Sequence, residues 1–195
     1  MIHAILLAAG ESRRMGRPKA LLPYQQETFL GHIISVLKTS TVDEITLVLG
    51  AHAEFIQSSI DLQGVSIVIN QHYTQGQLSS LISALKNLPE ETEAMLLCLV
   101  DNPFLTQETV NRIIAKFRET HSLIIVPVFD GKRGHPSLFS KEVFPDLIQA
   151  PPNQGARSVL ATHKNDVLEF PVADPGILIH IDTPEDYQRQ FGTCP

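Results

Sequence analysis

The chain has 195 residues, of which 43% are hydrophobic, and it carries a formal net charge of −6. The apolar share is large enough for a packed core, which excludes wholesale disorder. The acidic balance argues against a nucleic-acid-binding protein, and no apolar stretch approaches the length of a membrane span. We expect one compact domain over residues 1–195.

Strand-like and helix-like segments alternate along the chain. This alternation predicts an α/β fold of the Rossmann-like, three-layer type, with a mainly parallel central sheet. Expected strands cover 2–7, 45–49, 65–69, 94–100, 123–128, 167–170 and 177–181, with 94–100 in the centre of the sheet. Expected helices cover 28–38, 52–60, 77–88, 106–120, 156–163 and 185–190, the last with Pro184 in its first turn. Expected loops cover 130–136 and 150–155.

Cysteine usage and the first residues bear on location. Cys98 lies inside an apolar run and is expected to be a small buried hydrophobe, while Cys194 lies near the end of the sequence. Two such cysteines form no disulfide framework, which fits a reducing compartment. The sequence starts with a strand rather than a basic and then apolar leader, so we expect no secretion signal and a cytoplasmic protein.

The segment after the first strand is the strongest candidate for a binding loop. Ala8, Ala9 and Gly10 carry almost no side chain, so a ligand can approach the backbone closely. Gly10 and Gly16 allow successive N–H groups to curl around an anion. Four cations stand against one carboxylate, which gives a local charge of +3: Arg13, Arg14, Arg17 and Lys19 against Glu11. A bound polyphosphate would explain this cluster.

Two better-known phosphate motifs do not fit this loop. Five residues separate Gly10 from Gly16, and Lys19 comes three residues later, whereas a Walker A loop has four residues and then an immediate Lys. The dinucleotide fingerprint Gly-x-Gly-x-x-Gly is also absent. An ordinary strand-to-helix turn with surface cations is the alternative interpretation.

Two carboxylates follow predicted strands, and ligands bind at the carboxyl ends of strands in sheets of this kind. Asp101 ends the most apolar strand, where a magnesium ion would relieve the cost of burying its charge. Capping of the next helix is the alternative, although Thr106 is better placed for it. Asp182 repeats the arrangement, and either Asp182 or Thr183 is a candidate cap before Pro184.

Two further segments carry candidate ligand-binding groups. The loop Gly131-Lys132-Arg133-Gly134-His135-Pro136 combines cations with an imidazole, which turn chemistry alone does not explain. The segment Gln75-Gly76-Gln77-Leu78-Ser79-Ser80-Leu81 starts a helix, whose free N–H groups suit an anion or a base edge. A simple capped helix is the alternative for the second segment.

The sequence Leu-Ala-Ala-Gly-Glu-Ser-Arg-Arg-Met-Gly-Arg-Pro-Lys at 7–19 resembles the signature of the MobA-like NTP transferase family. The Gly-His-Pro and Asp-Thr-Pro segments are similar to its molybdenum cofactor cytidylyltransferase branch. The resemblance implies a nucleotidyltransferase fold and an Mg²⁺-dependent enzyme. Such an enzyme transfers a nucleoside monophosphate from a triphosphate to a phosphorylated acceptor and releases pyrophosphate.

The resemblance also implies roles for individual residues. Arg14 and Lys19 would bind the triphosphate and act in catalysis together with Asp101, and Asp101 and Asp182 would hold the metal. The nucleotide would be bound by Leu7, Ala8, Ala9, Gly10, Gly16 and Ser80. The acceptor would be bound by Gly134, His135 and Arg157, although His135 is equally a candidate structural hydrogen bonder and Arg157 a candidate surface cation.

The resemblance favours CTP as donor, because guanylyl-transferring relatives tend to have Gly where Ala9 stands. Molybdopterin is the expected acceptor, and a molybdenum hydroxylase or dehydrogenase is a possible partner. One alternative is an enzyme that activates a sugar or alcohol phosphate. Another is a carrier that binds a nucleotide or cofactor without chemistry, although a carrier needs no metal-binding pair.

Overall fold

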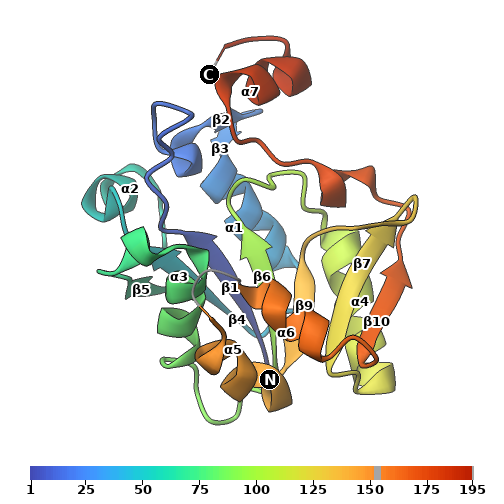
Figure 1. Cartoon of the computed structure of the whole chain (residues 1–195). Coiled ribbons are helices and arrows are strands. Elements are labelled where there is room, and N and C mark those ends of the chain that lie inside the picture. The colour runs from blue at the N-terminus through green and yellow to red at the C-terminus, as the bar shows by residue number, and fades with distance from the viewer. Residues whose placement is uncertain (152–154, 195) are drawn as a thin grey trace.

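The computed structural model describes residues 1–151 and 155–194, and these form a layered α/β fold (Figure 1). The strands of the main sheet are β1 (Ile2–Ala8), β4 (Glu44–Leu49), β5 (Ser66–Ile69), β6 (Ala94–Leu99), β7 (Ile124–Phe129), β8 (Lys132–Arg133), β9 (Ser137–Ser140) and β10 (Val167–Pro171). Their order is β10-β7-β9-β6-β1-β4-β5, with β8 paired to β7. A separate hairpin consists of β2 (Pro23–Tyr24) and β3 (Glu27–Thr28).

Helices cover both faces of the sheet. They are α1 (Phe29–Thr39), α2 (Ala53–Ser59), α3 (Gln77–Leu85), α4 (Gln107–Thr120), α5 (Phe144–Gln149), α6 (Ala156–Thr162) and α7 (Pro184–Phe191). One apolar cluster joins α1, α2 and α4 to the sheet, and a second joins α3, α5 and α6 to its opposite face. The predicted three-layer fold is therefore confirmed. Among the residues described, none of the helices has both the length and the apolar character that crossing a membrane requires.

The central strands explain why the sequence reads as continuous apolar runs. In β1, Ala4 and Leu6 face the cluster with α1, while Ile5 and Leu7 face the cluster with α3. A strand that is buried on both faces is apolar at nearly every position, and His3 is the exception in β1. The strand β6 lies in the middle of the order, as predicted, and its Cys98 is buried.

Helix starts agree with the capping residues expected from the sequence. The Thr28 hydroxyl accepts a hydrogen bond from Gly31 N at 3.0 Å, and the Thr106 hydroxyl accepts one from Thr109 N at 3.2 Å. Each hydroxyl satisfies an N–H group that the helix itself leaves free. Each predicted end of these two helices lies within one residue of the observed end.

The predicted strand over 177–181 is wrong. Residues Pro175–Leu178 form a 3₁₀ turn, whose start is capped by the Asp174 carboxylate through Gly176 N at 2.9 Å. The next residues are extended but make no strand ladder. Their backbone groups bond instead to the segment after β6, and this contact turns out to build the site.

The predicted loop over 130–136 is partly wrong. Asp130 and Gly131, both with positive φ, form a tight turn that pairs β8 with β7. The following strand β9 is inserted antiparallel between β7 and β6, and the short helix α5 comes next. Neither β9 nor α5 was expected, because segments of four to six residues show little periodicity. Residues 152–154 of the predicted loop over 150–155 lie outside the described residues.

The helix α7 packs away from the sheet, beside the hairpin β2–β3 (Figure 1). Its contacts are aromatic, with Phe191 stacked on Phe104 at 5.8 Å between ring centroids. The Tyr187 hydroxyl also donates to Pro23 O at 2.9 Å. The aromatic cluster fixes the start of α7, and therefore the position of the residues that precede this helix. Its members are Tyr24, Phe29, Phe104, Tyr187 and Phe191.

Candidate active site

A cavity of about 460 Å³ opens at the carboxyl ends of β1 and β6. It brings together most of the residues that the sequence singled out: Leu7, Ala8, Ala9, Gly10, Arg14, Lys19, Ser80, Asp101 and Asp182. Four other expected residues do not line it: Gly16, Gly134, His135 and Arg157. The walls are therefore made by the predicted loop, the start of α3 and the two carboxylates.

Asp101 and Asp182 converge on the ammonium group of Lys19. The Lys19 Nζ lies 3.6 Å from Asp101 Oδ2 and also donates to Asp182 Oδ1. The Arg14 guanidinium adds a second contact to Asp182, at 3.2 Å from Nη2 to Oδ2. Lys19 is 12% exposed and Arg14 69%, so the lysine is the buried partner and the arginine reaches in from solvent.

A buried side chain links the segment after β6, which carries Asp101, to the segment before α7, which carries Asp182. Asn102, which is 3% exposed, donates from Nδ2 to Gly176 O at 2.9 Å and to Ile179 O at 2.7 Å. Ile181 N donates to Asp101 O at 2.8 Å. These bonds fasten the segment that carries Asp182 to the end of β6.

Neither carboxylate acts as a helix cap. Thr183 begins α7 in a capping box, in which its hydroxyl accepts from Asp186 N at 3.2 Å and the Asp186 carboxylate accepts from Thr183 N at 3.0 Å. Thr106 begins α4. Both Asp101 and Asp182 are therefore free of the structural role that the sequence left open, and both face the cavity.

The loop between β1 and Lys19 is a tight turn that lines the cavity. Met15 N and Gly16 N both donate to Ser12 O, at 2.9 and 3.1 Å, and Lys19 N donates to Ser12 Oγ at 3.1 Å. Gly16 has φ +76°, which explains the glycine at this position. Among the described residues, a Cβ added to Gly10 would meet no atom within 4 Å beyond its chain neighbours, so the backbone there is open to a ligand.

Ser80 lies in the first turns of α3 and is almost fully buried at the cavity wall. Its hydroxyl accepts a hydrogen bond from Asn70 Nδ2 at 3.0 Å. The same amide also donates to the Ser79 hydroxyl at 2.8 Å. The Asn70 amide thus anchors the start of α3 and fixes the position of Ser80.

Gly134 and His135 lie beside the cavity. A Cβ on Gly134 would overlap the backbone of Ile177, so this glycine is required by packing. His135 N donates to Ile177 O at 3.0 Å, and its ring is half-buried. Burial and the nearby His180 lower the pKa of His135 to about 4, so its imidazole is neutral at pH 7. Arg157 is exposed near the start of α6, and its positive charge also disfavours protonation of His135.

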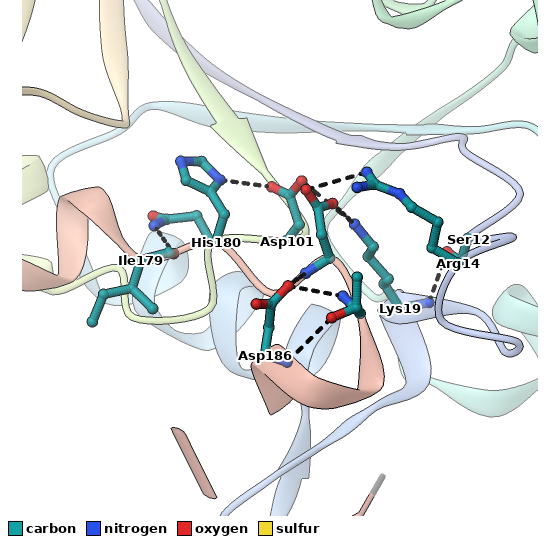
Figure 2. Close-up of polar contacts among 10 residues, drawn as sticks. Ser12, Arg14, Lys19, Asp101, Ile179, His180 and Asp186 are labelled. Atoms are coloured by element: carbon teal, nitrogen blue, oxygen red, sulfur yellow. Dashed lines mark hydrogen bonds and ion pairs between the residues drawn. The ribbon is translucent and has the colours of Figure 1, made fainter. Parts of the chain in front are cut away.

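His180 is a site residue that the sequence analysis missed. Its Nδ1 lies 3.3 Å from Asp101 Oδ1, on the side of the carboxylate away from Lys19 (Figure 2). The hydrogen bond to Asp101 raises the pKa of His180. Burial alone would raise the pKa of Asp101, but the bond from His180 and the charge of Lys19 outweigh burial and lower it. The signal for His180 in the sequence was a polar residue between two apolar ones, Ile179 and Ile181. Many surface residues show the same pattern, so it did not single out His180.

The two carboxylates fit a divalent cation whose remaining ligands come from the substrate. Two carboxylates already face one cationic group, and magnesium favours one or two carboxylates together with phosphate oxygens and water. Within residues 1–151 and 155–194, no cluster of three or more His, Cys, Asp or Glu side chains is arranged for a metal ion. A site with only two protein ligands fits a metal that arrives with a nucleotide better than a permanent structural ion.

Comparison with known proteins places these features in a family. The model of the MobA-like NTP transferase domain matches residues 4–167. The molybdenum cofactor cytidylyltransferase of Escherichia coli is 33% identical over 191 residues, which cover 95% of this chain and 93% of that protein. The nicotine blue oxidoreductase of Paenarthrobacter nicotinovorans is 33% identical over 118 residues, which cover 60% of this chain but only 57% of that protein.

A solved structure agrees with the observed fold. The Rv0371c protein of Mycobacterium tuberculosis, crystallised in complex with manganese, superimposes with a TM-score of 0.85 and 29% identity over 98% of both chains. The match over residues 4–167, together with the similarity to the cytidylyltransferase over nearly the whole chain, shows that this chain belongs to the MobA-like NTP transferase family.

Proposed function

We propose that this protein transfers the CMP group of CTP to molybdopterin and releases pyrophosphate. The observation that carries the proposal is the meeting of Asp101 and Asp182 at Lys19, within the cavity that the small-residue loop lines. The name of the Escherichia coli relative supports the same donor and acceptor. The sequence supports CTP through Ala9, where guanylyl-transferring relatives tend to have Gly. Ala9 lies at the cavity wall.

In this reaction an oxygen of the acceptor phosphate attacks the α-phosphorus of the triphosphate. The bond from the α-phosphorus to the oxygen that bridges to the β-phosphorus breaks, and pyrophosphate leaves with that oxygen. The acceptor is already an anion at neutral pH, so no strong general base is needed. Catalysis then depends on positioning and on neutralisation of charge.

Each group in the cavity has a role in this proposal. The open backbone of residues 7–10 and Ser80 bind the nucleoside, and Gly16 shapes the loop. Arg14 and Lys19 bind the triphosphate, which requires Lys19 to turn from the two carboxylates toward the phosphates. Asp101 and Asp182 hold Mg²⁺, an ion that would neutralise charge on the α-phosphate and on the departing pyrophosphate. The manganese in the Mycobacterium relative supports a divalent ion.

The acceptor is proposed to bind on the side of Gly134, His135 and Arg157. His135 is neutral, so it offers hydrogen bonds without charge, while Arg157 supplies a cation for a phosphate. We further propose that residues 1–195 act as a single nucleotidyltransferase domain, which the single main sheet supports. A molybdenum hydroxylase or dehydrogenase that receives the product stays a prediction from the sequence.

Pyrophosphate release tests the proposal. The protein is incubated with Mg²⁺ and each of the four nucleoside triphosphates, with molybdopterin, with sugar phosphates and without acceptor. We expect release only with molybdopterin, and fastest with CTP. Release with sugar phosphates but not with molybdopterin would assign the protein to the sugar-phosphate alternative. Nucleotide binding without pyrophosphate release in the presence of any acceptor would indicate a carrier.

A further inference from the structure

We propose that His180 is a positioning residue, which orients the Asp101 carboxylate so that one oxygen faces the bound cation. The inference deepens the proposed function and rests on it. His180 itself contacts neither the nucleotide nor the metal in this proposal. It acts through Asp101.

The direction of the hydrogen bond fixes the carboxylate. An ionised carboxylate can only accept, so the His180 Nδ1–H donates to Asp101 Oδ1, at 3.3 Å. The other oxygen, Oδ2, is the one that faces Lys19 at 3.6 Å. Figure 2 shows His180 and Lys19 on opposite sides of Asp101. The bond therefore restricts rotation of the carboxyl group and leaves Oδ2 for a cation.

The His180 ring is itself held in place from both sides along the chain. The preceding residue, Ile179, is bonded through its carbonyl to Asn102, and the following residue, Ile181, is bonded through its N–H to Asp101 O. The ring packs perpendicular to His135, with 5.7 Å between centroids. No part of this support requires a bound substrate, so Asp101 is oriented before the cation arrives.

A purely structural role for His180 makes a different prediction. The side chain is 35% exposed and makes no other hydrogen bond or ion pair among the described residues, so it contributes little to the core. Loss of a hydrogen bond that serves only stability would lower the melting temperature and leave metal binding unchanged. Loss of a positioning bond should weaken metal binding, typically by about 10- to 100-fold for a group that orients a metal ligand.

The test uses three variants of the full chain. His180→Ala removes the donor, whereas His180→Asn places an amide N–H close to the position of Nδ1. His163→Ala is the matched control, because His163 also contacts an aspartate, Asp146 at 2.7 Å, but lies outside the cavity. Manganese binding is measured by electron paramagnetic resonance, without nucleotide and with CTP. Pyrophosphate release is measured against the concentrations of Mn²⁺ and CTP.

For His180→Ala we expect manganese affinity to fall about 10- to 100-fold, with a matching rise in the manganese needed for half-maximal rate. The KM for CTP at saturating manganese should change less than threefold. His180→Asn should recover most of the affinity, and His163→Ala should match the wild type. If His180→Ala does not fold, the comparison is made between His180→Asn and His180→Leu, which has no donor.

Two outcomes contradict the inference in distinguishable ways. If the wild type binds manganese and releases pyrophosphate but His180→Ala does both equally well, His180 has no positioning role and the proposed function stands. If the wild type neither binds manganese with CTP nor releases pyrophosphate, the proposed function fails, and the role of His180 fails with it.

Discussion

The two carboxylates of the site are held in different ways. Asp101 lies two residues after the end of the central strand β6, its side chain is 26% exposed, and one of its oxygens is bonded to His180. Asp182 is 35% exposed, and within the part of the chain that the structure describes it follows a segment that joins no strand ladder and its oxygens contact only the cations Lys19 and Arg14. Asp101 is thus fixed by the sheet, whereas Asp182 depends on Asn102 and on the docking of α7.

This difference suggests a division of labour. The more rigid carboxylate is suited to be the principal metal ligand, since its position changes little when a ligand binds. The more exposed carboxylate, Asp182, is suited to release Lys19 and bind the metal as the nucleotide enters. Three experiments can break or sharpen this comparison, and a fourth tests a His–Asp pair outside the site.

Neutralising the two carboxylates in turn should have unequal effects. We expect Asp101→Asn to lower the rate of pyrophosphate release by about 1,000-fold or more, since the metal loses its main protein ligand in a preorganised site. Asp182→Asn should lower the rate by about 10- to 100-fold, since Asp101 and the phosphates still hold the ion. Equal losses, or a larger loss for Asp182→Asn, would contradict the comparison.

Removal of the lysine between the carboxylates should have opposite effects on the two ligands. In Lys19→Met the ammonium no longer competes with a cation, so we expect manganese to bind more tightly without nucleotide. The KM for CTP should rise by about 10- to 100-fold, because a charged hydrogen bond to the triphosphate is lost. Arg14→Gln, on the exposed side of Asp182, is the control and should change manganese binding less. Unchanged manganese binding in Lys19→Met would show that Lys19 does not occupy the cation position.

The link between the two segments can be broken at Asn102. Asn102→Ala leaves Ile179 O without its donor and removes one of the two hydrogen bonds to Gly176 O, which still accepts from Ile179 N at 3.1 Å, and we expect the free energy of unfolding to fall by about 2 kcal/mol. Manganese affinity should fall as well, since only the bond from Ile181 N to Asp101 O then fastens the segment that carries Asp182 to the end of β6. Asn87→Ala, which removes an exposed bond to Ser83 O, is the control for urea unfolding. A stable variant with intact manganese binding would mean that the bond from Ile181 N and the docking of α7 position Asp182 without Asn102.

The smallest expected effect concerns a His–Asp pair outside the site. Hydrogen bonds to Asp146 and Asp166 raise the pKa of His163 above 6.5 in the folded protein. The pair therefore stabilises the fold fully below that pH, and the contribution is lost as pH rises through the folded pKa. His163→Gln should cost less than about 1 kcal/mol at pH 5.5 in urea unfolding, and less still at pH 8.5. A larger cost at pH 8.5 would contradict this assignment.

The sequence by itself determined the layered architecture and half of the site. Strands that are buried on both faces are apolar at nearly every position, and helices have caps and a repeating apolar face, so both can be recognised locally. The binding loop is likewise local, because small residues, positive φ and clustered cations occur within 13 residues at 7–19. The sequence also predicted Asp101 as a site residue, because the apolar run of a buried strand ends just before it.

Only the tertiary structure decided the rest. The bonds of Asn102, the contact of His180 with Asp101 and the meeting of Asp182 with Lys19 all join segments more than 70 residues apart. The insertion of β9 between β7 and β6 likewise depends on partners that its four residues do not specify. The energy of such contacts comes from groups that are distant in the chain, so no local pattern of residues records them.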